Sequence, residues 1–313
     1  LTHLSHFAVE AKSDGSLGTS HGWTTGGADL VALGHTYGVQ VTLTATLFSG
    51  NGIATLLASA TARQDLIDNL LEIVQDQGGD GVNIDFEFVP KSSKTAFVKF
   101  MSDLTDTFHD EIEGSHVSLA TPAIDWSGAY DYDQLAIHTD GMMIMGYGYH
   151  WGGGNPGPAA PIDSGVTWPG KSLSWTIDDY IQWGGAENRS KFVLGLPLYG
   201  RDWPTVDASV PGVATDNGVA RYMTTCDDLF LLGKTWDEES QTPYRVFEST
   251  GATHQLFCED LASMEAKFDL INERDIGGVM FWALGYVPTD HSVWESSDAR
   301  FTLPPVVNTL PIA

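Results

Sequence analysis

Apolar residues at helical spacing alternate along this chain with short apolar runs of the kind found in β-strands. Within residues 63–77 the apolar side chains share one helical stripe, and Gly78 and Gly79 then end the predicted helix. A second stripe lies within residues 93–112. The stripe residues are Leu66, Ile67, Leu70, Leu71 and Val74 in the first helix and Phe97, Phe100, Met101, Leu104 and Phe108 in the second. A helix between two strands predicts that those strands run parallel.

The rest of the chain follows the same alternation of strand and helix. The predicted strands cover residues 4–11, 39–48, 82–88, 117–123, 141–150, 191–200 and 277–285, with a weaker one near 16–23. The predicted helices cover residues 28–38, 63–77, 93–112, 177–184 and 259–274. Strands separated by helices in this number predict an α/β fold, a (β/α)8 TIM barrel. An open doubly wound sheet is the alternative.

Residues 203–257 break this rhythm, because they hold short apolar pieces and turn residues such as TDNG and STGA. We interpret them as a small α+β insertion before the last strand, forming one wall of a cleft. The catalytic barrel then comprises residues 1–202 and 258–313. A chain of 313 residues suits a barrel with one insertion.

The stretch DGVNIDFEFVP, residues 80–90, contains a strand whose two faces differ in chemistry. Val82, Ile84, Phe86 and Phe88 point one way, and Asn83, Asp85 and Glu87 point the other. In a barrel the apolar face meets the helices, so the polar face lies inside, where burying a carboxylate costs several kcal/mol unless it is hydrogen-bonded. Glu87 falls at the carboxyl end of the strand, where barrel enzymes carry their active sites.

These acids suggest general acid chemistry. Asp85 lies close enough to Glu87 to raise the pKa of Glu87 by like-charge repulsion, and a protonated carboxyl is what a general acid needs. The alternative is a half-exposed antiparallel strand whose polar side chains face water. The helix and Gly-Gly stop that precede the strand favour the crossover unit instead.

The charge is strongly one-sided, with 41 acidic residues against 15 Lys and Arg and a net charge of −26. Nucleic acid and anionic membranes are therefore poor partners. An acid-rich, lysine-poor chain is typical of a halophile's protein, since high salt shortens the range of self-repulsion. The alternative is an ordinary acidic secreted enzyme. The two cysteines, Cys226 and Cys258, leave their pairing open.

The segment DGVNIDFE resembles the D-G-x-D-x-D-x-E signature of glycoside hydrolase family 18, the chitinases and endo-β-N-acetylglucosaminidases. Four further segments are similar to the family's in the same order: SHFAVE, MGYGYHW (145–151), LGLPLYGRDW (194–203) and GGVMFWALGY (277–286). WDEESQTPY (236–244) looks like part of the family's α+β insertion. The resemblance spans nearly the whole chain.

The resemblance implies a retaining mechanism in which the substrate's own 2-acetamido oxygen is the nucleophile. Glu87 would protonate the glycosidic oxygen and later activate water. Asp85 would hydrogen-bond the acetamido N–H, with Asn83 beside it, and Tyr147 would orient the acetamido carbonyl. No cofactor or metal is implied. The substrate would be chitin or chitooligosaccharide, with glycoprotein glycans or peptidoglycan as the alternative.

The resemblance also implies which residues contact the sugar. Trp282 would form the floor of the site, although an apolar strand could hold it simply as core. The other predicted substrate contacts are Tyr199, Arg201, Met145, Trp126 and Trp151, with Trp168 and Trp203 as further stacking candidates. About half of these tryptophans are expected to be structural, the tyrosines could be ordinary half-buried aromatics, and Arg201 could instead form a surface pair with Asp202.

Two positions depart from the family pattern. Asn83 stands where the family usually has Asp; it can hydrogen-bond Asp85 but cannot take a proton. We therefore expect Asp85 to be more readily ionised and activity to extend to acidic pH. Gly148 stands where an acid usually supports the acetamido group, so a non-hydrolytic chitin-binding lectin is a further alternative. Such lectins typically lack the acid at the position of Glu87, which is present here.

The remaining expectations concern the protein's setting. No apolar run is long enough to span a membrane. The first residues lack the basic patch and cleavage site of a signal peptide, so we expect that a leader has been removed. We expect a secreted, extracellular enzyme that acts as a monomer.

Overall fold

The computed structural model describes residues 1–301 and separates into two compact units. Unit 1 comprises residues 1–146 and 176–194, and unit 2 comprises residues 147–175 and 195 onward. The C-terminal part of the predicted barrel, residues 302–313, lies outside the described residues. The proposed division into a barrel and an insertion at 203–257 stays a prediction.

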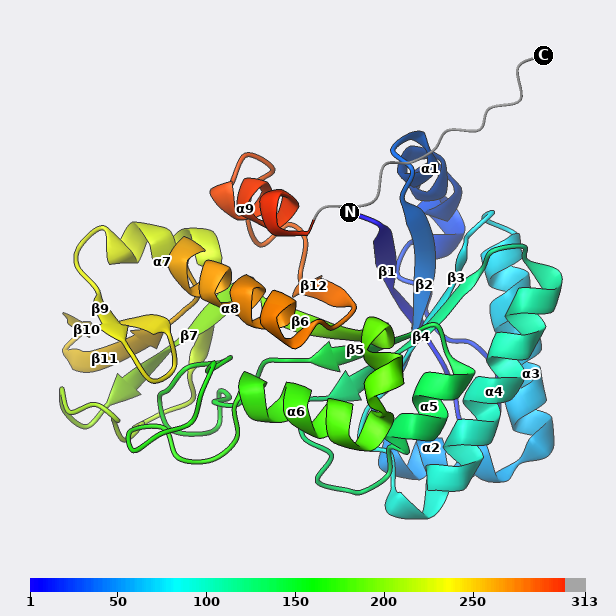
Figure 1. The fold of residues 1–313 in the computed structure, drawn as a ribbon, viewed down its shortest axis with the longest axis horizontal. Coiled ribbons are helices and arrows are strands. Elements are labelled where there is room, and N and C mark those ends of the chain that lie inside the picture. Colours follow the sequence, from blue (N-terminus) through cyan, green and yellow to red (C-terminus); the bar gives the residue numbers. More distant parts are fainter. Residues whose placement is uncertain (302–313) are drawn as a thin grey trace. The chain divides into compact units, whose positions relative to one another are not determined.

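Unit 1 is built on parallel strands that pair in chain order (Figure 1). They are β1 (His3–Glu10), β2 (Gln40–Leu47), β3 (Gly81–Phe86), β4 (His116–Pro122), β5 (Gly141–Met145) and the first residues of β6 (Phe192–Pro197). Every residue of β3 is buried, as expected for a parallel strand covered on both faces. The fold is that of an α/β half-barrel of parallel strands, and closure into eight strands stays a prediction.

Helices cover the outer face of these strands, with α3, α4 and α5 running along one side (Figure 1). They are α1 (Trp23–Thr36), α2 (Gly50–Ala58), α3 (Ala60–Gln75), η1 (Lys91–Ser93), α4 (Lys94–Glu111), α5 (Tyr132–His138), α6 (Leu173–Gly184) and η2 (Ala186–Lys191). The predicted stripe of α4 is buried along its whole length, and that of α3 is buried except for the half-buried Leu71. The side chains of Ser49 and Ser59 cap α2 and α3 by accepting backbone N–H bonds.

Three sequence-based expectations about strands are wrong. The strand near 16–23 is absent from the described residues: Leu17 makes only an isolated bridge to Ala11, and α1 begins at Trp23. Among the described residues the sheet therefore has seven strands rather than eight, in the order β1-β2-β3-β4-β5-β6-β12, where β12 is Gly278–Trp282. The strand predicted at 141–150 ends at Met145. Phe88, expected on the apolar face, is 72% exposed at φ +65°, because β3 ends at Phe86 and the chain turns.

Unit 2 contains a separate antiparallel sheet in the order β8-β7-β11-β10-β9 (Figure 1). Its elements are β7 (Tyr199–Thr205), β8 (Val219–Tyr222), α7 (Met223–Phe230), β9 (Thr235–Asp237), β10 (Thr242–Ser249) and β11 (Ala252–Phe257). They are followed by α8 (Leu261–Arg274), β12 (Gly278–Trp282) and α9 (Ser292–Arg300). The mixture of short strands and one helix matches the α+β character expected of this stretch.

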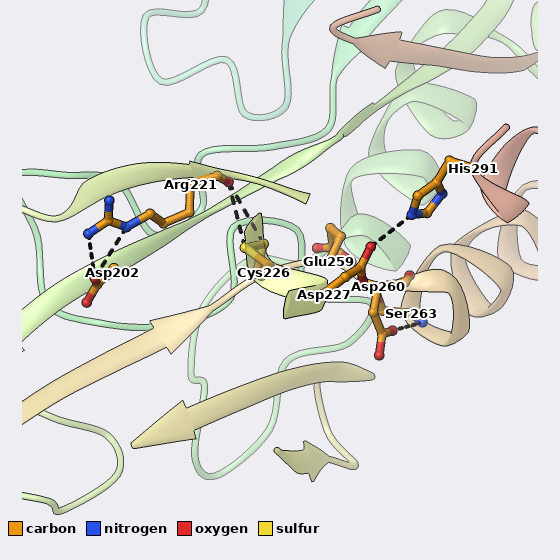
Figure 2. Close-up of a disulfide and its surroundings, with 9 residues drawn as sticks. Asp202, Arg221, Cys226, Asp227, Glu259, Asp260, Ser263 and His291 are labelled. Atoms are coloured by element: carbon orange, nitrogen blue, oxygen red, sulfur yellow. Dashed lines mark hydrogen bonds and ion pairs between the residues drawn. A yellow bond between two sulfur atoms is a disulfide. The ribbon is translucent and has the colours of Figure 1, made fainter. Parts of the chain in front are cut away.

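A disulfide fastens α7 to the chain just after β11 (Figure 2). Cys226 and Cys258 are both buried, and their sulfur atoms lie 2.09 Å apart. The pairing that the sequence left open is therefore present. Next to Cys258, Glu259 and Lys267 form a fully buried ion pair of 2.6 Å. These links fix the packing of α7 and α8 within unit 2.

Residues 1–301 contain neither a membrane-spanning helix nor a cluster of metal-binding side chains. No helix there combines the length and apolar character needed to cross a bilayer. Nor does any group of three or more His, Cys, Asp and Glu side chains there have the spacing of a metal site.

Candidate active site

β3 carries three polar side chains of unit 1 that the sequence selected as candidate catalytic residues. Asn83 and Asp85 lie within the strand and are 9% and 7% exposed. Glu87 follows the end of the strand and is half-buried, and its backbone N–H donates to the carbonyl of Leu47 at 3.2 Å. Because side chains alternate along a strand, Asn83 and Asp85 share one face, while Val82 and Ile84 are buried on the other. Glu87 lies close enough to Asp85 for its charge to raise the pKa of Asp85, and the catalytic roles of the three residues stay a prediction.

The buried carboxyl of Asp85 is strongly perturbed. Burial, with the nearby charge of Glu87 as a second cause, raises the pKa of Asp85 to about 7. Its Oδ1 atom is buried and makes no hydrogen bond within residues 1–301. A carboxyl in this state holds its proton to neutral pH and carries a high cost of ionisation. Burial is the first cause of this shift. The expectation that Asn83 leaves Asp85 more readily ionised than an Asp at that position would is a separate comparison, and it stays a prediction.

The pKa of Glu87 is also raised, in the predicted direction but for a different reason. The cause is burial of the Glu87 carboxyl, whereas the like-charge repulsion acts on the pKa of Asp85. The carboxyl of Glu87 is less buried than that of Asp85, because Glu87 lies at the partly open end of the strand. A half-buried carboxyl whose pKa is raised above its usual value keeps its proton to higher pH, as a general acid requires.

Asn83 is held by a neighbouring strand rather than by an acid. Its Oδ1 accepts a hydrogen bond from the Ser118 hydroxyl of β4 at 3.0 Å. On the other side, the register places Thr44 and Thr46 of β2 beside Asn83 and Asp85. The three buried threonines of β2, Thr42, Thr44 and Thr46, alternate with apolar residues. This alternation was a sequence signal for a polar interior face that the sequence analysis did not use.

Tyr130 is a second feature that the sequence analysis missed. Its buried hydroxyl donates to the carbonyl of Phe86 at 2.8 Å, which fastens the end of β3 next to Glu87. Burial raises the pKa of Tyr130, and the charges of Asp125, Asp85 and Glu87 add to the effect. The proximity of Tyr130 to the acids joins segments far apart in sequence, so no local pattern could have shown it.

Two predicted substrate contacts also belong to unit 1. Met145 is the last residue of β5 and is half-buried. Trp126 follows β4 and is 81% exposed, so its ring is free to contact a ligand from solvent. Both lie beyond or at the carboxyl ends of parallel strands, which is the end where barrel enzymes bind substrate.

The other predicted residues belong to unit 2, where several lie close together. The rings of Tyr147 and Tyr199 meet edge to face with centroids 6.3 Å apart. The guanidinium of Arg201 lies 6.0 Å from the Tyr199 ring and donates to the carbonyl of Gly218. Burial raises the pKa of Tyr199 to about 12, so its hydroxyl stays protonated. Trp282 ends β12, and its carbonyl accepts from Leu198 at 2.9 Å.

The tryptophans divide into exposed and buried groups. Trp151 is 62% exposed and remains a stacking candidate. Trp168 and Trp203 are 4% and 0% exposed and pack against Phe257, so their selection as sugar-stacking candidates was wrong. The alternative of an Arg201–Asp202 surface pair is also wrong, because Asp202 is buried and binds other partners. These partners are Arg221 at 2.9 Å and His254 at 2.8 Å (Figure 2 shows the first).

Comparison with known sequences decides the family. Residues 44–286 match the Glycosyl hydrolases family 18 over most of the chain. The chain belongs to glycosyl hydrolase family 18. The matched residues include β3 with Asp85 and the following Glu87.

Relatives within family 18 fall into two groups by name. The chain is 30% identical over 280 residues to a putative sporulation-specific glycosylase, YdhD, of Bacillus subtilis, covering 83% of this chain and 62% of that protein. It is 25% identical over 295 residues to a cortical fragment-lytic enzyme of Bacillus anthracis, covering 91% of this chain and 65% of that enzyme. The chain therefore spans less than two thirds of either relative.

A solved structure represents the second group. The C-terminal domain of a putative chitinase from Desulfitobacterium hafniense is 25% identical, with a TM-score of 0.82 over 96% of this chain and 90% of that one. The similar proteins thus carry two kinds of name, a sporulation-specific glycosylase and a cortical fragment-lytic enzyme on one side and a putative chitinase on the other.

The departure from the family 18 pattern at Gly148 has a structural counterpart. Gly148 has φ +81°, a region that side-chain-bearing residues rarely adopt. An acid at this position would strain the backbone as it stands, so the loop conformation and the glycine go together. Of the neighbours that could replace the acid, His150 packs its ring against Trp168. Tyr149 donates its hydroxyl to the carbonyl of Ser172 at 3.2 Å.

Proposed function

We propose that this protein is a retaining glycosidase that cleaves β-1,4 bonds of N-acetylglucosamine polymers, with Glu87 as general acid and base. Membership of family 18 supplies the hydrolase class. The observation that carries the assignment of the acid is the half-buried Glu87 at the carboxyl end of β3, with its pKa raised by burial and with the buried Asp85 two residues before it.

The chemistry follows from the two carboxyls. Glu87 gives its proton to the glycosidic oxygen as the bond to the anomeric carbon breaks. The acetamido oxygen of the substrate attacks that carbon, because no second carboxylate is assigned as nucleophile in this family. Asp85, in its ionised form, accepts the acetamido N–H and stabilises the positive charge of the oxazolinium. Glu87 then takes a proton from a water molecule as the water oxygen attacks the anomeric carbon. The oxazolinium ring opens, and the configuration at that carbon is retained overall.

Chitin or chitooligosaccharide is the substrate that the charge of the chain favours. A net charge of −26 repels anionic polymers, and chitin is neutral whereas peptidoglycan carries peptide carboxylates. The second candidate, an endo-β-N-acetylglucosaminidase acting on peptidoglycan or glycans, is supported by the names of the Bacillus relatives. The presence of Glu87 speaks against a lectin.

Roles for residues of unit 2 remain part of the proposal. Tyr147 would orient the acetamido carbonyl, and Trp282 would lie under the sugar, with Tyr199 and Arg201 beside it. A secreted location is proposed as well, and the Cys226–Cys258 disulfide supports it, since disulfides persist in oxidising compartments. A salt-rich habitat and a monomeric state are proposed without further support.

Matched substrates test the proposal. Chitooligosaccharides should be cleaved with retention, and the same oligomers after deacetylation should be cleaved at least about a hundredfold more slowly, because they lack the internal nucleophile. Purified peptidoglycan strands assayed alongside decide between the two substrates. Equal rates on acetylated and deacetylated oligomers would refute the mechanism, and faster cleavage of peptidoglycan would make the second candidate the function.

A further inference from the structure

The segment between β5 and α6, residues 146–172, is long and has no regular secondary structure of its own. It carries Tyr147, a predicted catalytic residue, and Trp151, a predicted substrate contact. Loops of this length are uncommon unless they serve a function or are held by other contacts. Several of the contacts that hold this one lie within unit 2, at the end of β9 and in the turn between β9 and β10.

Glu239, in that turn, binds the segment through its carboxylate. Oε1 accepts the backbone N–H of Val166 at 3.1 Å, and Oε2 accepts those of Thr167 at 2.9 Å and Trp168 at 3.2 Å. Slight burial opposes ionisation, but the hydrogen bonds outweigh it and hold the pKa of Glu239 below its usual value. Three backbone donors around one carboxylate form an anion-binding nest filled by the protein's own side chain.

The same turn holds the segment at two further points. Asp237 accepts the indole N–H of Trp168 at 2.8 Å, and its carboxylate also binds the backbone N–H of Ser240 at 2.8 Å. The carbonyl of Ser240 accepts the N–H of Ile162 at 3.1 Å. Because Trp168 is buried, these bonds join the segment to the core of unit 2 rather than to its surface.

Gly165 shows how closely the carboxylate and the segment fit. A Cβ atom added at Gly165 would lie 2.5 Å from the carboxyl carbon of Glu239. That distance is far below van der Waals contact, so any side chain at 165 would displace the carboxylate. A substitution at Gly165 therefore provides a second way to break the contact, by changing the segment instead of Glu239.

At the other end of the segment lies a cavity of about 390 Å³. It is lined by Gly153, Gly154, Asn155, Ala214, Thr215, Asp216 and Asn217. The exposed ring of Trp151 lies against Gly153, where an added Cβ would be 2.3 Å from the ring. An open aromatic face beside amide, hydroxyl and carboxylate groups suits a sugar ring. The backbone N–H of Gly218 donates a hydrogen bond of 2.7 Å to the carbonyl of Gly152, and this bond joins the wall of the cavity to the segment.

We propose that Glu239 is a positioning residue that holds the 146–172 segment in place, so that Trp151 and this cavity bind a sugar unit of a long glycan chain. The inference rests on the proposed function, because it assigns the cavity to the same polymeric substrate. A short substrate does not need this extra unit. Loss of the contact should therefore affect affinity for long chains and leave the chemical step unchanged, because the ring of Tyr147 also packs edge to face against Tyr199, a contact that does not involve Glu239.

The test compares Glu239→Ala with Glu238→Ala, which removes the neighbouring acid that contacts only Gln241 among the described residues. For chitohexaose, Glu239→Ala should raise KM by about tenfold with kcat unchanged, and for a fluorogenic chitobioside both constants should stay within about twofold. Glu238→Ala should match the wild type throughout. Glu239→Gln should lie between, because its single amide oxygen can replace only one of the two accepting carboxylate oxygens, and its NH2 group donates rather than accepts.

Two further measurements separate the possible outcomes. Amide hydrogen exchange at Val166, Thr167 and Trp168 should speed up in Glu239→Ala and in Gly165→Ala, and the double variant should raise KM no further than either alone. Faster exchange with an unchanged KM for chitohexaose would overturn the positioning role while the wild type still cleaves the chitobioside. A wild type that cleaves neither substrate would overturn the proposed function, and this inference with it.

Discussion

Replacing Asp85 with Asn should make the protein more stable and less active, and the gain in stability should depend on pH. Burial raises the pKa of Asp85 from 3.8 to about 7. At neutral pH, ionising this carboxyl therefore costs about 4 kcal/mol more in the folded protein than in the unfolded chain. We attribute the presence of this costly carboxyl to catalysis, because ionised Asp85 stabilises the oxazolinium.

The sign of the pH dependence follows from linkage. The folded state keeps the proton to higher pH than the unfolded state, so the contribution of Asp85 to stability is most favourable below about pH 4. It falls as the pH rises from about 4 to about 7 and is constant above that. Asn does not titrate. The advantage of Asp85→Asn over the wild type should accordingly be about 3 kcal/mol larger near pH 8 than near pH 4.5.

Urea unfolding at the two pH values measures this difference, with activity on chitooligosaccharide measured in parallel. Asp106→Asn is the matched control, since Asp106 is an exposed residue of α4. It should show no comparable dependence on pH. An advantage of Asp85→Asn that is equal at both pH values, or a loss of stability near pH 8, would refute the argument that burial dominates this site.

Three further predictions concern charge and cross-linking. Asn83→Asp should raise the pKa of Asp85 further by like-charge repulsion and move the acidic limb of the pH–rate profile upward; an unmoved profile would contradict this. With a net charge of −26, the apparent Tm should rise as KCl increases from about 0.1 M to about 2 M, because the Debye length shrinks; a constant or falling Tm would count against adaptation to salt. The disulfide closes a separation of 32 residues, so the Cys226→Ala, Cys258→Ala double variant should lose about 3 to 4 kcal/mol, seen as a lower urea midpoint; an unchanged midpoint would contradict it.

Periodic elements were predictable from sequence because their signals are local. The stripe from Phe97 to Phe108 is buried in α4 as its spacing required. The alternation around Asp85 correctly separated the apolar face of β3 from its polar face. In both cases the geometry of one element decides which side chains are buried.

Features that depend on distant partners were not predictable in this way. Trp168 and Trp203 are buried while Trp126 and Trp151 are exposed, and nothing in their local sequence separates them. The bond from Tyr130 to the Phe86 carbonyl joins residues 44 positions apart. The three backbone bonds to Glu239 likewise span about 70 positions in the chain. Such contacts arise from tertiary packing, which residue spacing does not encode.

The pKa of Asp85 illustrates the same limit for electrostatics. The sequence shows which acids are neighbours, and it led to an argument from charge repulsion alone. Burial is the larger cause, and it depends on every strand and helix around the site. Sequence reasoning therefore selected carboxyls whose pKa is raised but underestimated burial as the cause, and their catalytic roles stay a prediction.

The most direct test of the central claim is the Glu87→Gln variant, measured for both turnover and binding. If Glu87 is the proton donor, kcat on a fluorogenic chitobioside should fall by at least about a thousandfold, because the amide cannot donate to the leaving group. The Kd for chitohexaose, measured by calorimetry, should stay within about threefold of the wild-type KM, since the side chain keeps its shape. A variant that retains a substantial part of the wild-type rate would show that another group supplies the proton.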